Sequence, residues 1–170
     1  MPILKNDYDN NSFTRISLEI NLVKNRMFDF CSNRDDYLNW IPFEFKFNVG
    51  SNETYSYPQE CGATFSFEEL KYLLKGIDDL INAIKLADYS DEKICDETRC
   101  FKFYTLECYF GLTLTDAFDG LIAVKLWVNM GSLSNGSDSG YDRGFHFPVA
   151  MESVIKFKNE LKEQLEIMIK

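Results

Sequence analysis

A small set of side chains in this sequence combines reactive groups with a spacing that could support catalysis. His146 is the single histidine, and it stands between Phe145 and Phe147. Alternation along a strand would place its imidazole on the face opposite those two rings. A general base also needs a nucleophile and an orienting carboxylate nearby, and Cys108 and Asp142 are the candidates. No local signature accompanies them, so the sequence favours an ordinary histidine over a catalytic Cys-His pair.

Adjacent carboxylates are a second candidate, because paired acids can hydrolyse glycosides or bind divalent cations. Each pair also has a structural explanation. Glu68 and Glu69 suit the start of a helix through the helix dipole, and residues 88–99 lack the spacing of a calcium loop. We therefore expect a protein that is not an enzyme. The pairs are Asp35-Asp36, Glu68-Glu69, Asp78-Asp79, Asp91-Glu92 and Asp96-Glu97.

Cofactor and metal signatures are also missing. The glycine-rich residues 131–140 have neither the Lys-Ser/Thr ending of a phosphate loop nor the GxGxxG spacing. The five cysteines follow no common zinc spacing, and their odd number without a signal peptide indicates reduced thiols in a cytoplasm. We expect small buried thiols with one or two exposed ones, and no cofactor or metal.

The charge balance points to a protein partner. Twenty-seven acidic residues against eighteen Lys and Arg give a net charge of −9, and the arginines are scattered. This excess argues against nucleic acid and suits a basic protein, although a negative surface also serves solubility alone. An acidic loop at 88–97 and a pliable loop at 131–142 are the expected contact regions. The candidate partner-binding residues are Asp88, Asp91, Glu92, Asp96, Glu97, Asp138, Tyr141 and Asp142.

Hydrophobic periodicity in the first half of the chain predicts strands followed by a helix. Residues 16–22 and 43–49 alternate apolar and polar side chains, which is typical of strands with one wet face. Pro42 marks the start of the second strand, Tyr55 and Tyr57 suggest a short third one, and residues 24–39 form a connection. Ser66 and Glu69 make a capping box before a stripe of apolar residues, which predicts a helix over 67–86. Gly76 inside it suggests close packing against a sheet.

The second half predicts a return to strands and a closing helix. Residues 101–115 alternate with a shift of phase that suggests a bulge near Tyr104. Asp119-Gly120 signals a tight hairpin, with strands at 122–128 and 145–149 after it. Apolar residues from Met151 to Met168 then follow one face of a helix.

These elements predict an α+β fold, in which two amphipathic helices cover a mainly antiparallel curved sheet. A sandwich and a barrel are the two forms that such a curved sheet could take. The length suits a single globular domain over 1–170. No apolar run approaches the length of a membrane span. We expect a cytoplasmic protein without membrane contact.

Three strings resemble the small bacterial WapI-type immunity proteins. They are F-S-F-E-E-L…L-L-x-G-I around residues 66–77, T-L-E-C-Y-F-G-L-T-L at 105–114, and R-G-F-H-F-P-V at 143–149. The similarity covers most of the chain from about Phe13, and it carries no functional residue with it. It implies a protein that neutralises a partner toxin, often a nuclease, made by the same cell.

Two functions of different kinds follow. The first is a cytoplasmic immunity protein that blocks a basic toxin or enzyme by covering its surface. The alternative is a small-ligand pocket or weak enzyme in the aromatic-rich sheet, built from Tyr104, Tyr109, Trp127 or His146. A structural domain without either activity is the third possibility.

Overall fold

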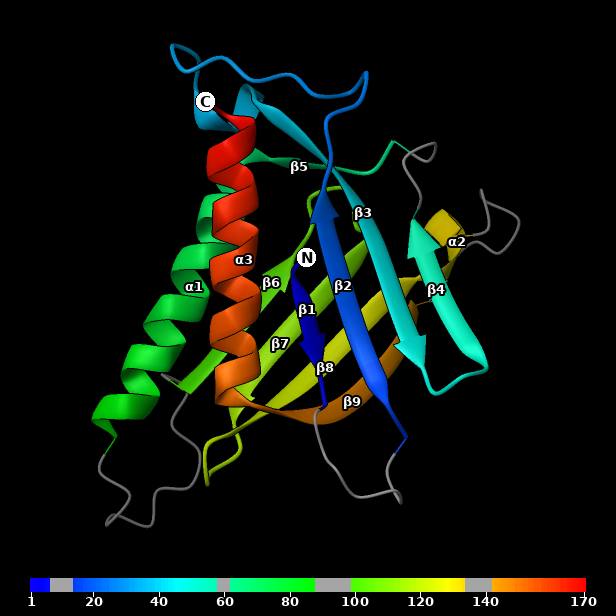
Figure 1. Ribbon diagram of the computed structural model, residues 1–170, viewed down its shortest axis with the longest axis vertical. Helices are drawn as coiled ribbons and strands as arrows, with labels where there is room; N and C mark the ends of the chain where they lie inside the picture. Colours follow the sequence, from blue (N-terminus) through cyan, green and yellow to red (C-terminus); the bar gives the residue numbers. More distant parts are fainter. Residues whose placement is uncertain (7–13, 58–61, 88–98, 134–141) are drawn as a thin grey trace.

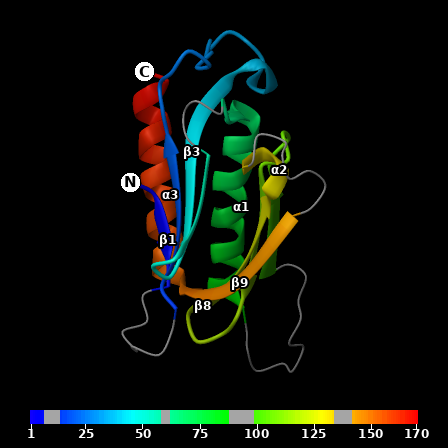
Figure 2. The same cartoon turned by 90° about the vertical axis from the view of Figure 1, so that its right-hand side faces the viewer.

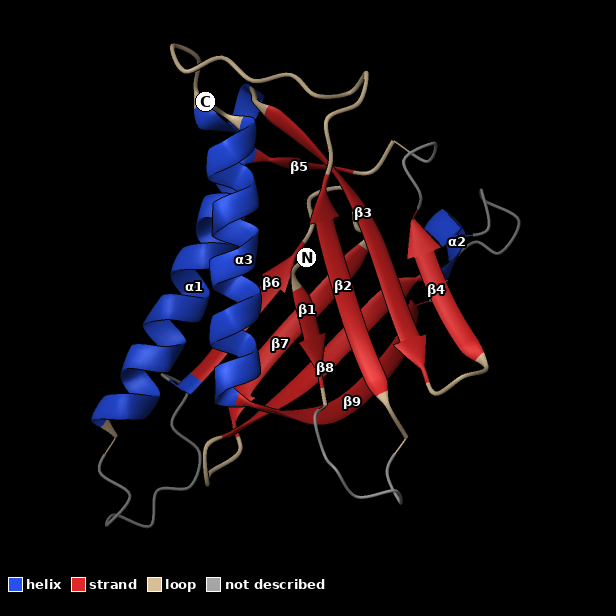
Figure 3. Ribbon diagram, in the orientation of Figure 1, coloured by secondary structure: helices blue, strands red, loops and turns tan. Residues whose placement is uncertain are grey.

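The computed structural model describes residues 1–6, 14–57, 62–87, 99–133 and 142–170. These residues form two antiparallel sheets and two long helices, which confirms the predicted α+β class (Figure 1). Figure 3 shows that the strands make up one side of the molecule and the long helices the other. The sheets face each other as a sandwich, and the described strands do not close into a barrel.

The first sheet has the strand order β1-β2-β3-β4, with β5 paired to the start of β3. The predicted strand at 43–49 begins earlier, at Trp40, because Trp40 to Pro42 pair with β5. Pro42 therefore lies inside the strand and not at its start. The strand tolerates the amide N–H that proline lacks at this position. The Pro42 carbonyl accepts from the Val23 amide at 2.9 Å. The strands are β1 (Ile3–Lys5), β2 (Ile16–Leu22), β3 (Trp40–Val49), β4 (Glu53–Tyr57) and β5 (Thr64–Ser66).

The second sheet has the order β6-β7-β8-β9, and each strand pairs with the next along the chain. The expected bulge near Tyr104 is wrong, because the chain reverses there and residues 105–109 form a turn between two strands. The Asp119-Gly120 hairpin is confirmed, with Phe118, Asp119 and Gly120 all at positive φ. The strands are β6 (Cys100–Tyr104), β7 (Phe110–Asp116), β8 (Leu121–Asn129) and β9 (Asp142–Ala150).

The helices fill the side of the sandwich at which β1 and β6 lie (Figures 1 and 2). Helix α1 (Phe67–Leu86) has the predicted bounds and packs against β6 and the second long helix, α3 (Met151–Met168), which in turn covers β1 and β2. The capping box is present, since the Ser66 hydroxyl accepts from the Glu69 amide at 3.1 Å. A 3-10 turn (Asp36–Leu38) and a one-turn helix, α2 (Met130–Leu133), complete the described elements.

The core lies between the two sheets and under the helices. Phe43, Phe45 and Phe47 of β3 are almost fully buried, as their alternation predicts. Their rings contact those of the second sheet, with centroids 5.1 Å apart for Phe45–Phe110 and 4.7 Å apart for Phe47–Phe145. This aromatic layer joins the sheets and fixes the outer face of β6–β9 as a surface that points away from the core.

Candidate interaction surface

The predicted partner-binding residues fall almost entirely outside the described residues. Asp142 is the exception: it begins β9, is exposed, and lies opposite Asn129 of β8. The others in that set are Asp88, Asp91, Glu92, Asp96, Glu97, Asp138 and Tyr141, and the structure describes none of them.

The sequence of the segments without a described structure carries most of the net charge. Residues 7–13, 58–61, 88–98 and 134–141 contain nine of the 27 acidic residues and one of the 18 basic ones. They therefore contribute −8 of the net −9, and the described residues are close to neutral. The charge of this protein is thus concentrated in four short stretches of sequence.

A turn between β6 and β7 shapes one end of the second sheet. The Thr105 hydroxyl accepts from the Tyr109 amide at 2.8 Å, and the Thr105 carbonyl accepts from the Cys108 amide at 2.9 Å. Cys108 has a φ of 55°, in the left-handed region. The Glu69 carboxylate accepts from the Leu106 amide at 2.7 Å and holds the turn against the start of α1. Tyr104 and Cys108 consequently lie at a surface pocket.

That pocket has a volume of about 350 Å³ and lies on the outer face of the second sheet. Tyr104 and Trp127 are exposed at 61% and 44%, respectively, and stand on strands separated by β7. Two of the four residues proposed for a ligand pocket are therefore brought together. Tyr109 packs instead between the sheets, against Tyr57. The lining residues are Tyr104, Thr105, Cys108, Phe110, Gly111, Trp127, Asn129 and Asp142.

Two glycines let these rings lie on the sheet. The register aligns Tyr104, Gly111, Trp127 and Gly144 as neighbours across four strands, which we call the aromatic row. A Cβ atom at Gly111 would lie 2.5 Å from the Tyr104 ring, and one at Gly144 would lie 2.5 Å from the Trp127 ring. Real Cβ atoms do not approach other atoms so closely, so each ring occupies the space above a glycine.

The neighbouring row on the same face is cationic. Lys102, Thr113, Lys125 and His146 are aligned across the four strands, and we call them the lysine row. Lys102, Lys125 and His146 are exposed, and Thr113 is buried between the two lysines. Within the described residues, neither ammonium group has a carboxylate partner.

His146 points away from the core, as alternation predicts. Phe147 beside it is buried, and the cross-strand neighbour of His146 is Lys125. In the described part of the chain its imidazole makes no hydrogen bond or ion pair. Cys108 lies at the pocket while His146 stands in the next row, so the structure does not assemble the hypothetical Cys-His pair.

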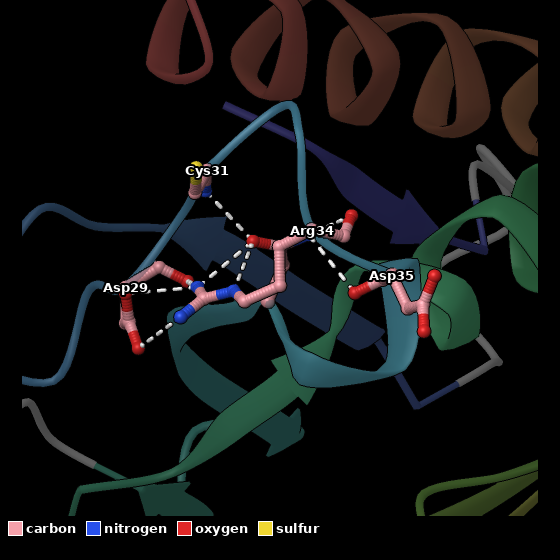
Figure 4. A network of polar contacts seen from close by, with 5 residues as sticks. Asp29, Cys31, Arg34 and Asp35 are labelled. Carbon is pink, nitrogen blue, oxygen red and sulfur yellow. Dashed lines mark hydrogen bonds and ion pairs between the residues drawn. The ribbon is translucent and has the colours of Figure 1, made fainter.

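A separate polar network orders the connection between β2 and β3 (Figure 4). Arg34 donates to both carboxylate oxygens of Asp29, at 3.0 and 2.8 Å, and to the side-chain oxygen of buried Asn39 at 2.9 Å. The Cys31 amide donates to the same Asn39 oxygen at 2.7 Å. The hydrogen bond from Arg34 lowers the pKa of Asp29. Every strong donor and acceptor in this cluster has a partner, so we interpret it as a structural clamp.

Among the residues that the structure describes, the thiols and the metal-binding groups give no further site. The three described cysteines, Cys31, Cys100 and Cys108, are outside disulfides. Cys31 and Cys108 are exposed, which agrees with the one or two exposed thiols expected, but Cys100 is half-buried, so none of the three is a fully buried thiol. In the described ranges, no three His, Cys, Asp or Glu side chains are grouped so that they could hold a metal ion. Among the helices that the structure describes, none is long and apolar enough to cross a membrane.

Comparison with known protein families defines the class. The chain belongs to the WapI-like immunity protein family, whose model matches residues 8–168. The resemblance drawn from the three sequence strings is thereby confirmed. Membership supports an immunity function and, in general terms, binding to a toxin. A comparison with curated proteins finds no match.

Proposed function

We propose that this protein is the cytoplasmic immunity partner of a basic toxin and inactivates it by covering its working surface, without catalysis. The observation that carries the proposal is the family match over residues 8–168. A single domain of this size can cover a surface of standard interface dimensions, about 800 Å² per partner.

The basic character of the toxin is inferred from charge. Segments 7–13, 58–61, 88–98 and 134–141 contribute −8 of the net −9. Concentrated charge of one sign attracts a partner of the other and accelerates encounter, an effect that salt screens over about 10 Å at 0.1 M. We place the main electrostatic contact on 88–97, together with Asp138, Tyr141 and Asp142.

The test is a binding titration with a candidate toxin domain, which is to be sought in the neighbouring gene. Asp91→Lys with Glu92→Lys, and separately Asp96→Lys with Glu97→Lys, should each raise the Kd by about tenfold or more at low salt, mainly through slower association. The wild-type Kd should itself rise with salt concentration.

The matched control is Glu163→Lys with Glu166→Lys on α3, where both side chains are exposed. It changes the net charge by the same amount at a different place. Equal weakening by the control would mean that net charge matters and the 88–97 contact is wrong. A toxin that the wild-type protein fails to bind would contradict the proposed function itself.

A further inference from the structure

The outer face of the β6–β9 sheet exposes aromatic side chains on a surface that could have remained polar. Tyr104 and Trp127 keep 61% and 44% of their area in water. Large exposed apolar side chains that gather on one face mark interaction sites, and Tyr and Trp are the residues that most often dominate binding energy at protein interfaces. The aromatic row is therefore a candidate contact surface, distinct from the acidic segments.

The two rings are held in place before any partner arrives. The Tyr104 ring lies directly above Gly111 and the Trp127 ring above Gly144. Each ring fills the space that a Cβ atom on the glycine would need. A side chain that is already ordered before binding loses less conformational entropy when the partner arrives. The pocket of about 350 Å³ between them is thus a preformed recess for one apolar side chain.

The lysine row gives the face a charge opposite to that of the protein as a whole. Lys102 and Lys125 flank Thr113 on alternate strands, so they stand about 10 Å apart, and they are about 7 Å from the aromatic row. Neither has a carboxylate partner in the described residues, and Asp142 lies at the far end of the pocket. Charge complementarity calls for a partner with carboxylates beside its apolar group.

We propose that this face docks a protein segment in which carboxylates flank an apolar side chain. The apolar side chain enters the pocket between Tyr104 and Trp127, and the carboxylates meet Lys102 and Lys125. The inference rests on the proposed function in that the toxin supplies the segment. The toxin then contacts this protein at a second, cationic surface, which adjoins the acidic one at Asp142 because Asp142 also lines the pocket.

The decisive variant is Lys102→Gln with Lys125→Gln, titrated with the toxin domain. A basic toxin attracted only by net negative charge would bind this variant more tightly, because two positive charges are removed. Our inference predicts the opposite sign: the Kd rises by about tenfold, since two charge pairs at an interface are lost. Lys46→Gln with Lys156→Gln, on β3 and α3, changes the charge equally and should leave the Kd unchanged or lower it.

A second variant tests the aromatic row without removing a contact side chain. Gly144→Ala forces the Trp127 ring from its position and should weaken binding by about tenfold, because the hot-spot ring is displaced. Gly120→Ala is the control, since a Cβ there meets no atom within 4 Å, although its φ of 74° adds local strain. Circular dichroism and thermal unfolding establish that both variants fold.

The outcomes separate the two proposals. If the wild-type protein neutralises the toxin and the lysine and Gly144 variants bind as tightly as it does, the inference is overturned and the proposed function stands. If the wild-type protein does not bind the toxin, the proposed function fails and the inference fails with it. Binding of a single-stranded RNA oligonucleotide that disappears in Trp127→Leu would also overturn the inference, because the face would then serve nucleic acid.

Discussion

The Tyr57 hydroxyl of the first sheet lies 2.7 Å from the backbone carbonyl of Tyr109 and so makes a polar contact between the two sheets. Tyr57 is fully buried at the end of β4, and the carbonyl of Asn129 lies 3.1 Å from the same oxygen. The contact therefore fixes the first sheet to the end of the second sheet that carries Tyr104 and the pocket. The surface that we propose for toxin binding depends on this attachment.

Tyr57→Phe should destabilise the protein by about 0.5–1.5 kcal/mol, because it removes the hydroxyl that bonds to the second sheet while it keeps the ring. The Tyr109 carbonyl keeps its bond from the Asn129 amide at 3.0 Å, so the cost is that of one hydrogen bond. The measurement is the free energy of unfolding in denaturant. Tyr55→Phe on the same strand is the control: its hydroxyl bonds to the half-exposed Glu53 carboxylate at 3.2 Å, and its loss should cost less. Equal effects of the two variants would contradict the special role of Tyr57.

Gly76→Ala should destabilise the protein by about 1–3 kcal/mol, although alanine favours helices by about 1 kcal/mol over glycine. A Cβ atom at Gly76 would lie 2.0 Å from the Phe101 ring, so the helix or the ring must move. Thermal unfolding checks this expectation. Asn82→Ala, at an exposed position of the same helix, should be neutral or stabilising.

Phe101→Leu combined with Gly76→Ala completes a double-mutant cycle. The smaller side chain should remove part of the clash, so the two costs should sum to more than the cost of the pair. Additive costs would show that Phe101 is not the group that excludes a side chain at position 76.

Glu69→Ala should cost about 2–4 kcal/mol, which exceeds the roughly 0.5–2 kcal/mol expected for Ser66→Ala. One Glu69 oxygen accepts from the Ser66 amide at 2.6 Å and the other from the Leu106 amide at 2.7 Å. Loss of the carboxylate therefore releases both the start of α1 and the turn that carries Cys108. Hydrogen exchange at the Leu106 amide should accelerate in Glu69→Ala and stay slow in Ser66→Ala. The same exchange rate in both variants would refute the second contact.

Asp29→Asn should remove the contribution that the Asp29–Arg34 ion pair makes to the free energy of unfolding, and this contribution depends on pH in the acid range. Arg34 lowers the pKa of Asp29 below its ordinary value of 3.8 in the folded protein. The unfolded chain therefore binds the proton more readily, and the ion pair contributes fully above pH 3.8 and fades as the pH falls through the folded pKa. The gap in unfolding free energy between wild type and Asp29→Asn should be largest above pH 3.8 and should close below it. A gap that widens toward acid would contradict this sign.

Local patterns predicted most of the elements. The 67–86 helix, its capping box and the hairpin at Asp119-Gly120 follow from short-range rules, because caps and positive-φ turns need particular residues at particular places. The α+β class follows from the same patterns. The turn at 105–109 was missed, since a shift of phase between two strands looks the same whether it arises from a bulge or a reversal.

The interaction surface was less accessible to sequence reasoning. Lys102 and Tyr104 lie two residues apart on one face of β6, as Lys125 and Trp127 do on β8. Their alignment into rows depends on how strands β6 and β8 each pair with β7. The signal was present in Gly111 and Gly144, which stand opposite Tyr104 and Trp127 and gain meaning only once the strands are paired. Charge alone directed attention to the acidic segments and away from a cationic face.

The most direct test of the central claim is a titration of toxin activity against this protein. A candidate cognate toxin domain, sought first in the neighbouring gene, is assayed on its own substrate, in cells and in solution, with increasing amounts of the wild-type chain. Our account predicts that growth is restored and that activity falls to zero near one equivalent, with no change to the toxin after the complex is separated. Undiminished activity at a large excess of this protein, or a toxin that stays chemically altered after separation, would contradict it.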